Sequence, residues 1–335
     1  MAATIRRASS GRALLARRRF LLAGAGAVFS ASRAVRAQTY PSQPIRFVVG
    51  FPPGGGADIV SRIMAAWLSE RLGQSVFIEN KPGASTNLSL QTVVNAPPDG
   101  HTLVFIAASA SVNVSLFKNL QFDLKRDIAP VAGLVDFPLV LLANPAFPAK
   151  TVAELIAYAK ANPGKVSIGS FGTGTTSHVS GELFKQLAGI EMVHVPYRGG
   201  AALATDLMAG RVQVGIDVLT GELPHIQAGA IRALAVAARM RYSALPDVPT
   251  IAETIPLYVA NSWAGVGVPR GTPPAVIARL NYEINAGLAN PTVRARLAEV
   301  AATPMPLAPD AFGTYLGSEI DKWAKVIEAA NIKVE

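Results

Sequence analysis

Short runs rich in β-branched residues alternate with segments of helical periodicity along nearly the whole chain after residue 40. This alternation predicts an α/β protein in which helices flank mostly parallel sheets. The predicted strands are Ile45–Val49, Val76–Glu79, Thr102–Ile106, Leu139–Ala143, Val166–Ile168, Met192–Val195, Gln213–Asp217 and Ala233–Ala237. The predicted helices between them are Asp58–Leu72, Ser89–Ala96, Thr151–Ala161, His178–Ala188, Ala201–Ala209 and Leu223–Ala228.

The pattern changes after about Trp263, where only helices are predicted. These three helices are Pro273–Leu288, Pro291–Val300 and Asp310–Ala330. A length of 335 residues suits two lobes, and a helical tail can return to cover the first of them. We therefore expect a discontinuous first lobe of residues 40–139 plus 260–335 and a second lobe of residues 140–259, joined by two chain crossings.

Arginine dominates the first 37 residues, which hold eight arginines and no acidic residue. This segment carries nearly all of the net charge of +9, so the rest of the chain is close to neutral. A near-neutral chain has no general attraction for phosphate backbones, and nucleic acid is not an expected partner.

The same segment has the order of an export signal. Arg17, Arg18 and Arg19 precede the apolar run Leu22–Phe29, and the small-residue site Val35–Ala37 follows. We predict that residues 1–37 are a cleaved signal of the twin-arginine type and that the protein works in the periplasm of a Gram-negative bacterium. A membrane anchor is disfavoured because the run is far shorter than the about 20 residues that a spanning helix needs.

Three loops rich in glycine or hydroxyl groups follow predicted strands and precede predicted helices. They are residues 51–58, 80–87 and 170–178. In open α/β sheets the ligand crevice lies at the carboxyl ends of the strands, where free amides and small residues suit an anion. Ordinary strand-to-helix turns with helix caps are the alternative for each loop.

Two further side chains follow predicted strands. Tyr197 can close over a small ligand, whereas the neighbouring Arg198 is equally well explained as a surface charge. Asp217 ends an apolar strand, where it can accept from a ligand amine, order a water or cap a helix that begins near Thr220.

Catalytic and metal-binding patterns are sparse. The chain has no cysteine, which excludes disulfides, thiolate metal sites and cysteine nucleophiles. Its four histidines are not spaced as helical metal pairs, so no metal site is expected. His178 follows Thr175, Thr176 and Ser177, which leaves a hydrolase with His178 as base as an alternative, although no G-x-S-x-G motif is present. His194 is expected to be structural.

Nine sequence blocks, in order, resemble the Bug family, the TctC-type extracytoplasmic solute receptors of tripartite tricarboxylate transporters. The blocks are residues 40–46, 51–58, 79–84, 98–103, 150–155, 178–184, 194–199, 245–250 and 269–273. The resemblance implies a type II-like periplasmic-binding-protein (Venus flytrap) fold, whose two lobes close around a small carboxylated ligand without catalysis or cofactor. It implies a monomer that delivers its ligand to membrane permease subunits, with signalling to a sensor kinase as the alternative role.

The resemblance also implies that backbone amides near the Gly54-Gly55 pair hold one ligand carboxylate. The ligand-binding residues expected on this basis are Phe51, Gly54, Gly55, Asp58, Ser85, Thr86, Ala108, Ser109, Ser170, Thr173, His178, Tyr197 and Asp217. The family usually has a glycine-rich pair where this chain has Ser85 and Thr86, and we expect their hydroxyls to narrow the pocket. Backbone donors without an assured arginine favour a small mono- or dicarboxylate over citrate.

Overall fold

The computed structural model describes residues 40–238, 240–242, 244–258, 260–329 and 332. The fold below is that of the compact unit Pro41–Glu335. The predicted export signal, residues 1–37, lies outside the described residues.

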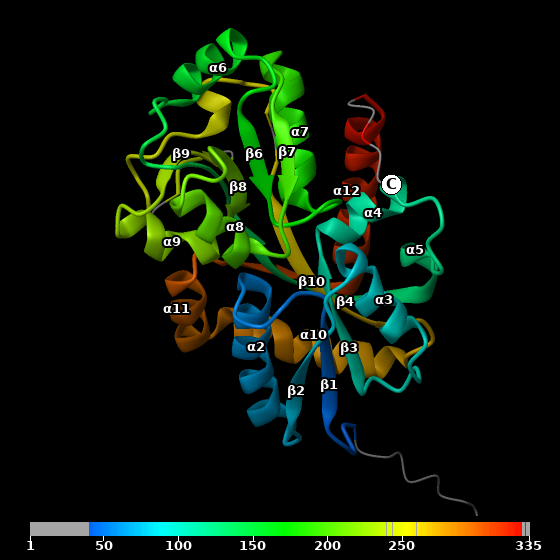
Figure 1. The fold of residues 1–335 in the computed structure, drawn as a ribbon. Coiled ribbons are helices and arrows are strands. Elements are labelled where there is room, and N and C mark those ends of the chain that lie inside the picture. Colours follow the sequence, from blue (N-terminus) through cyan, green and yellow to red (C-terminus); the bar gives the residue numbers. More distant parts are fainter. Residues whose placement is uncertain (1–39, 239, 243, 259, 330–331, 333–335) are drawn as a thin grey trace, which may run out of the picture. The chain divides into compact units, whose positions relative to one another are not determined.

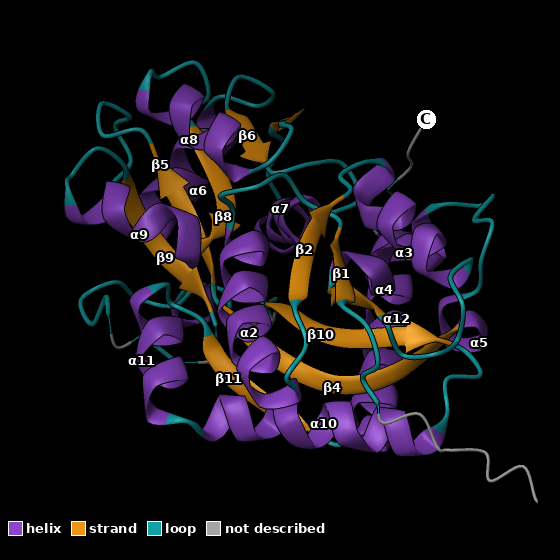
Figure 2. Ribbon diagram, turned by 90° about the horizontal axis from the view of Figure 1, so that it is seen from below, coloured by secondary structure: helices purple, strands orange, loops and turns teal. Residues whose placement is uncertain are grey.

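The first sheet has six strands in the order β11-β4-β10-β3-β1-β2 (Figures 1 and 2). Its strands are β1 (Ile45–Val49), β2 (Val76–Asn80), β3 (Thr102–Ala107), β4 (Ile128–Phe137), β10 (Ser262–Pro269) and β11 (Thr303–Leu307). β1 is parallel to β2 and β3, whereas β10 is antiparallel to β3 and β4, and β11 is antiparallel to β4. We call this sheet with its helices the first lobe. The helices are α2 (Gly56–Leu72), α3 (Asn87–Val94), α4 (Ser109–Leu116), α5 (Leu124–Asp127), α10 (Pro274–Ala289), α11 (Pro291–Glu299) and α12 (Pro309–Ala329), with the 3-10 turn η1 (Ala84–Thr86).

The second sheet has five strands in the order β7-β6-β8-β5-β9 (Figures 1 and 2). They are β5 (Leu139–Ala143), β6 (Ser167–Ser170), β7 (Val193–Pro196), β8 (Val214–Val218) and β9 (Arg232–Ala237). β6 is parallel to β7 and β8, and β5 is antiparallel to β8 and β9. The second lobe is this sheet with α6 (Val152–Ala161), α7 (Thr176–Ala188), α8 (Gly200–Met208), α9 (Leu219–Gln227) and the 3-10 turn η2 (Ile251–Glu253).

The chain passes between the sheets twice. β4 of the first sheet ends at Phe137 and β5 of the second begins at Leu139, and the chain returns between β9 and β10. α12 then packs Trp323 and Ile327 into the same buried cluster as Leu139. The exact lobe boundaries at residues 139/140 and 259/260 stay a prediction.

The predicted α/β fold class is confirmed, and every predicted strand and helix has a counterpart shifted by a few residues. Three strands were not predicted, because their sequences lack an ordinary strand pattern: β4 contains Pro130, β10 is rich in small residues and β11 contains two prolines. In β10, a Cβ atom at Gly265 would clash with the Phe312 ring, so this glycine lets α12 pack directly on the sheet. These strands and β5 also make both sheets mixed rather than uniformly parallel.

Candidate ligand-binding site

A cavity of about 300 Å³ lies between the two sheets. Its first-lobe wall comes from the loop before α2, the end of β3 and the start of β10, and its second-lobe wall comes mainly from the starts of α8 and α9. The lining residues are Phe51, Pro52, Pro53, Gly54, Gly55, Gly56, Ala57, Phe105, Ala107, Ser109, Phe137, Phe171, Thr176, Arg198, Gly199, Gly200, Ala201, Ala204, Asp217, Val218, Gly221, Glu222, His225, Ser262 and Trp263. A cavity of this size suits a small metabolite.

The Asp58 carboxylate holds the loop before α2 in place. The Asp58 carboxylate accepts from Gly54 N at 3.0 Å, from Arg62 Nε at 2.8 Å and from Asn80 Nδ2 at 2.9 Å. Burial raises the pKa of the Asp58 carboxyl, but these hydrogen bonds outweigh burial and hold it below its usual value. Asp58 lies outside the cavity lining and fixes the loop that lines it.

The start of α2 offers backbone donors to the cavity. Gly55 is the N-cap residue and provides no side-chain cap, and Gly55, Gly56 and Ala57 all line the cavity. The first amides of a helix have no intrahelical acceptor, and the helix dipole favours an anion beside them. Gly54 also lines the cavity, but its amide is already bonded to Asp58.

Across the cavity, the side chain of Asp217, near the end of β8, lies beside Gly200, the first residue of α8. A Cβ atom at Gly200 would clash with Asp217 Oδ2, and Val218 N donates to Asp217 Oδ1 at 2.6 Å. α9 has Val218 as its N-cap with no side-chain cap, so the alternative in which Asp217 caps that helix is wrong. The carboxylate instead occupies the position beside α8 that a bound anion would favour.

Asp217 is paired with a second acid, Glu222, in the first turn of α9. Each residue is 1% exposed, and both line the cavity. Burial raises the pKa of both carboxyls, and the charge of Asp217 raises that of Glu222 further. We call Asp217 and Glu222 the acid pair.

Five of the predicted ligand-binding residues line the cavity, and eight lie outside its lining. Those that line it are Phe51, Gly54, Gly55, Ser109 and Asp217. Those outside it are Asp58, Ser85, Thr86, Ala108, Ser170, Thr173, His178 and Tyr197.

Ser85 and Thr86 do not narrow the cavity, because the backbone turns them elsewhere. Ala84, Ser85 and Thr86 all have positive φ angles, of 46°, 53° and 77°. In this conformation the Ser85 hydroxyl donates across the cleft to the carbonyl of Thr173 in the second lobe. Thr86 Oγ1 lies 3.4 Å from Ser109 Oγ within the first lobe.

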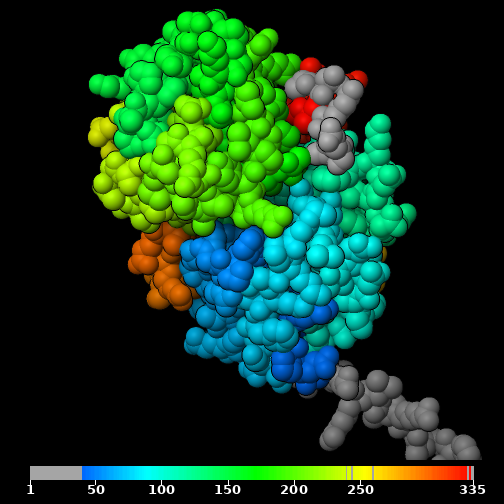
Figure 3. Space-filling model, viewed as in Figure 1, coloured from blue at the N-terminus to red at the C-terminus, as the bar shows by residue number. Residues whose placement is uncertain are grey.

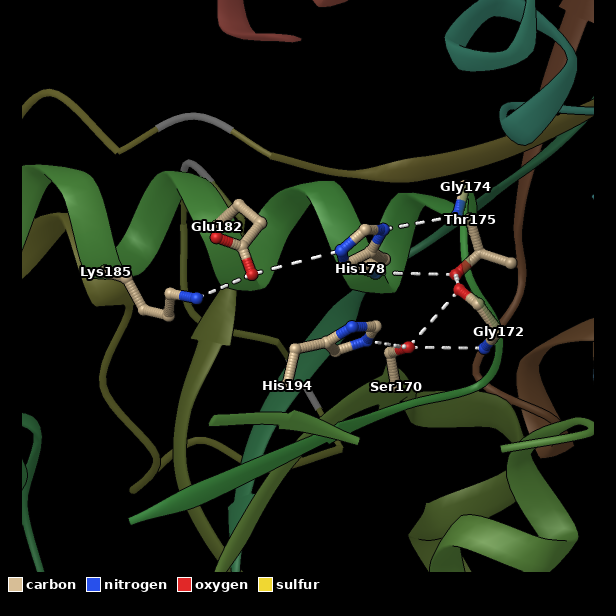
Figure 4. Close-up of polar contacts among 8 residues, drawn as sticks. All are labelled: Ser170, Gly172, Gly174, Thr175, His178, Glu182, Lys185 and His194. Carbon is tan, nitrogen blue, oxygen red and sulfur yellow. Dashed lines mark hydrogen bonds and ion pairs between the residues drawn. The ribbon is translucent and has the colours of Figure 1, made fainter. Parts of the chain in front are cut away.

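Ser170, His178 and the half-buried His194 form a cluster behind the loop that precedes α7 (Figure 4). The two imidazole rings stack with centroids 3.9 Å apart, and Ser170 Oγ lies 2.7 Å from His194 Nε2. Gly174 N donates to His178 Nδ1 at 3.2 Å. Burial lowers the pKa of each histidine to about 4, so both are neutral at physiological pH. The cluster shapes the loop, and the expected structural role of His194 agrees with these contacts.

The Tyr197 hydroxyl donates to Asp206 Oδ2 at 3.1 Å, a contact within the second lobe. Its neighbour Arg198 lines the cavity, although from the sequence a surface charge was an equally good interpretation of this residue. The residues that sequence reasoning missed include Phe171, Thr176, Glu222, His225, Ser262 and Trp263. An acid in the first turn of a helix ordinarily indicates a favourable dipole contact, so nothing in the sequence marked Glu222 as part of a cavity.

The contacts around His178 differ from those that the hydrolase alternative requires. Thr175 Oγ1 donates to the carbonyl of Gly172 at 2.6 Å, and Ser177 Oγ donates to that of Ile216. Thr176 Oγ1 donates to Ser262 Oγ at 3.3 Å. Each of these three hydroxyls thus has a partner other than the His178 ring. Within the described residues, no group of three or more metal-ligating side chains could hold a metal ion, and no helix is long and apolar enough to cross a membrane.

Known proteins resemble this chain in both sequence and fold. Residues 60–332 match the family model described as tripartite tricarboxylate transporter family receptor, TctC. BugT of Bordetella pertussis is 36% identical over 304 residues, covering 90% of this chain and 93% of BugT.

Two solved structures add ligands to the comparison. The R. palustris protein Rpa4515, solved with adipate, is 36% identical with a TM-score of 0.85, covering 88% of this chain and 99% of that one. MatC of Rhodopseudomonas palustris, solved with bound malate, is 32% identical with a TM-score of 0.81, covering 86% of this chain and 100% of MatC. With its two-lobe fold and interlobe cavity, the chain belongs to the TctC family of tripartite tricarboxylate transporter receptors, the family of the Bug solute-binding proteins.

Proposed function

We propose that this protein captures a small carboxylate between its two lobes in the periplasm and delivers it to the membrane permease of a tripartite transporter. In this proposal residues 1–37 are a cleaved export signal, the receptor acts as a monomer, and no step is catalytic. The observation that carries it is the cavity wall at the start of α2, where Gly55–Ala57 present backbone amides to an interlobe space of about 300 Å³.

The proposed contacts are the predicted residues that line the cavity, with the start of α2 as the carboxylate site. Phe51 and Phe171 supply apolar walls from opposite lobes, their ring centroids 6.5 Å apart. Asp58, Ser170 and His178 act by holding the adjacent loops. Adipate in Rpa4515 and malate in MatC support a carboxylate ligand of modest size.

Calorimetry of the purified protein tests ligand capture. The panel contains monocarboxylates, dicarboxylates including adipate and malate, tricarboxylates including citrate, and carboxylates that carry an amino group. Binding of at least one compound at micromolar affinity is the expected result. Failure of the entire panel would overturn the proposal.

A matched pair of variants locates the site. In Gly55→Leu the new side chain meets open space, because the nearest atom to a Cβ atom there is Pro52 O at 3.9 Å. The fold should therefore be retained. The leucine side chain should block the ligand's approach to the α2 amides. Gly317→Leu on α12, where the nearest atom is Lys125 Nζ at 4.0 Å, is the control. We expect affinity to be lost only in Gly55→Leu.

Delivery to a permease is tested in cells. Deletion of the gene should abolish uptake of the radiolabelled ligand identified by calorimetry, and the wild-type gene should restore uptake. Undiminished uptake in the deletion strain would contradict the transport role.

A further inference from the structure

One contact between the lobes lies outside the cavity. The Ser85 hydroxyl, on the turn η1 of the first lobe, donates to the carbonyl of Thr173 on the loop before α7 of the second lobe. Neither residue lines the cavity. The contact therefore joins the lobes through groups that a ligand in the cavity does not use.

The first lobe holds the donor in place. Ala84, Ser85 and Thr86 all have positive φ angles, which residues other than glycine adopt only at a cost in energy. Asn113 Nδ2, on α4, donates to Ser85 O at 2.6 Å and to Asn87 Oδ1 at 2.9 Å. These bonds fix the turn in the conformation that directs the Ser85 hydroxyl to the second lobe.

The second lobe holds the acceptor in place (Figure 4). On one side of Thr173, Gly172 O accepts from Thr175 Oγ1 at 2.6 Å. On the other side, Gly174 N donates to His178 Nδ1 at 3.2 Å. Because donor and acceptor are both positioned within their own lobes, few groups must be ordered when the lobes meet, and little entropy is lost.

The loop before α7 also packs closely on α4 of the first lobe. A Cβ atom at Gly174 would lie 3.1 Å from Leu116 Cδ2 and 3.2 Å from Phe117 Cε2. Leu116 is the last residue of α4, and Phe117 follows it. The hydrogen bond from Ser85 is thus part of a packed contact that exists only while the lobes touch.

We propose that the hydrogen bond from Ser85 to Thr173 is a latch that stabilises the closed lobes by the same amount whichever ligand is bound. The bond forms only when the lobes meet, so it raises the closed fraction of the protein before a ligand arrives. A larger closed fraction strengthens the apparent affinity for every ligand by one common factor. The effect on affinity rests on the proposed function, whereas the effect on closure does not.

Distances between two spin labels test the latch without any ligand. The chain has no cysteine, so Ala66→Cys on α2 and Ala209→Cys at the end of α8 place one label on each lobe, both at exposed positions. Pulsed electron paramagnetic resonance of this labelled protein measures the closed and open populations. Adding Ser85→Ala should lower the ratio of closed to open protein by about fivefold, as expected for the loss of one hydrogen bond.

Two further variants accompany Ser85→Ala. Ser85→Gly also lacks the hydroxyl, but glycine readily adopts the φ of 53° at this position, so this variant should fold and should open the lobes equally. Ser318→Ala is the matched control, because it removes a hydroxyl-to-carbonyl hydrogen bond of 2.7 Å within α12, from Ser318 to Tyr315. It should leave the closed population unchanged. Thermal unfolding verifies that each variant is folded.

Calorimetry with malate and with adipate tests the effect on affinity. Ser85→Ala and Ser85→Gly should each weaken the binding of both compounds by the same factor, about fivefold. Ser318→Ala should bind both as the wild type does. A factor that differs between malate and adipate would show that Ser85 acts on the ligand itself, and would overturn the latch.

The distances separate the latch from the proposed function. If both Ser85 variants keep the distance distribution of the unsubstituted labelled protein, the latch is overturned while carboxylate capture stands. If malate or adipate does not bind, the distances in the ligand-free protein still decide whether the latch exists. The wider carboxylate panel then decides on the proposed function separately.

Discussion

At the scale of single residues, burial changes the protonation of Glu222 in a direction that stability measurements can detect. Burial and the neighbouring Asp217 raise the pKa of Glu222 above its ordinary value of 4.5. Between the unfolded and the folded pKa, the native state holds more protons than the unfolded state, so the free energy of unfolding decreases as the pH rises through this range.

Glu222→Gln should remove this decrease. Arg198 and His225 also line the cavity, and both are retained in the variant. We expect the stability of the variant relative to wild type to increase from pH 5 to pH 8 in urea unfolding experiments. Parallel pH profiles for the two proteins would show that Glu222 is not buried as a protonated acid.

The stacked histidines have the opposite dependence on pH. Burial lowers the pKa of His178 and His194 to about 4, from an ordinary value of 6.5. Their contribution to stability is present in full above pH 6.5 and is lost as the pH falls towards 4, because the unfolded state takes up protons first. His194→Gln, which can still hydrogen-bond to Ser170 Oγ, should show a shallower loss over this range.

Ser170→Ala is the control for that experiment. It removes the 2.7 Å contact to His194 Nε2 without removing a titrating group, so it should lower stability by a similar amount at each pH. A His194→Gln profile as steep as that of the wild type would contradict the burial of a neutral imidazole.

At the scale of elements, the start of α2 is closely fitted to the start of α9. A Cβ atom at Gly56 would lie 3.1 Å from Thr220 Cγ2 in the opposite lobe. Gly56→Ala should hinder closure at a cost of about 1 kcal/mol, which corresponds to roughly fivefold weaker ligand binding in calorimetry.

Thr220→Ser removes the methyl group that the new Cβ atom would contact. The double variant of Gly56→Ala with Thr220→Ser should therefore recover part of the affinity, because the Cβ atom of residue 220, 3.2 Å from the new Cβ atom, remains. If the double variant binds as weakly as Gly56→Ala alone, the loss has another cause than the contact between α2 and α9.

At the scale of the whole molecule, the two lobes are in contact around the cavity. The first-lobe residues Phe51, Ser85 and Ser262 each touch the second lobe, at Phe171, Thr173 and Thr176 respectively. On the face drawn in Figure 3, the blue segment that holds α2 meets the green segments of the second lobe directly. These contacts define a closed arrangement of the lobes.

Ligand should shift the protein towards this closed arrangement, because only the closed state provides contacts from both lobes. We expect the radius of gyration of the wild-type protein, measured by small-angle scattering, to decrease on saturation with ligand. Gly55→Leu should retain the larger value at the same ligand concentration. A wild-type value that stays constant at saturation would contradict closure.

The sequence by itself determined the α/β class, eight of the strands and the family, because these follow from local patterns of residues. It also located the loop before α2, where a run of glycines between a strand and a helix is a local signal. β4, β10 and β11 escaped prediction because strands with proline or small residues are stabilised by their neighbours in the sheet.

Tertiary structure alone decided which side chains face the cavity. Asp58, Ser85 and His178 carry the polar groups expected of a binding site, yet their partners lie in the surrounding loops. Glu222 lines the cavity only because α9 begins at Leu219 and packs beside the end of β8. Pairing of Glu222 with Asp217 depends on where two elements meet in space, and no pattern in the sequence encodes that distance.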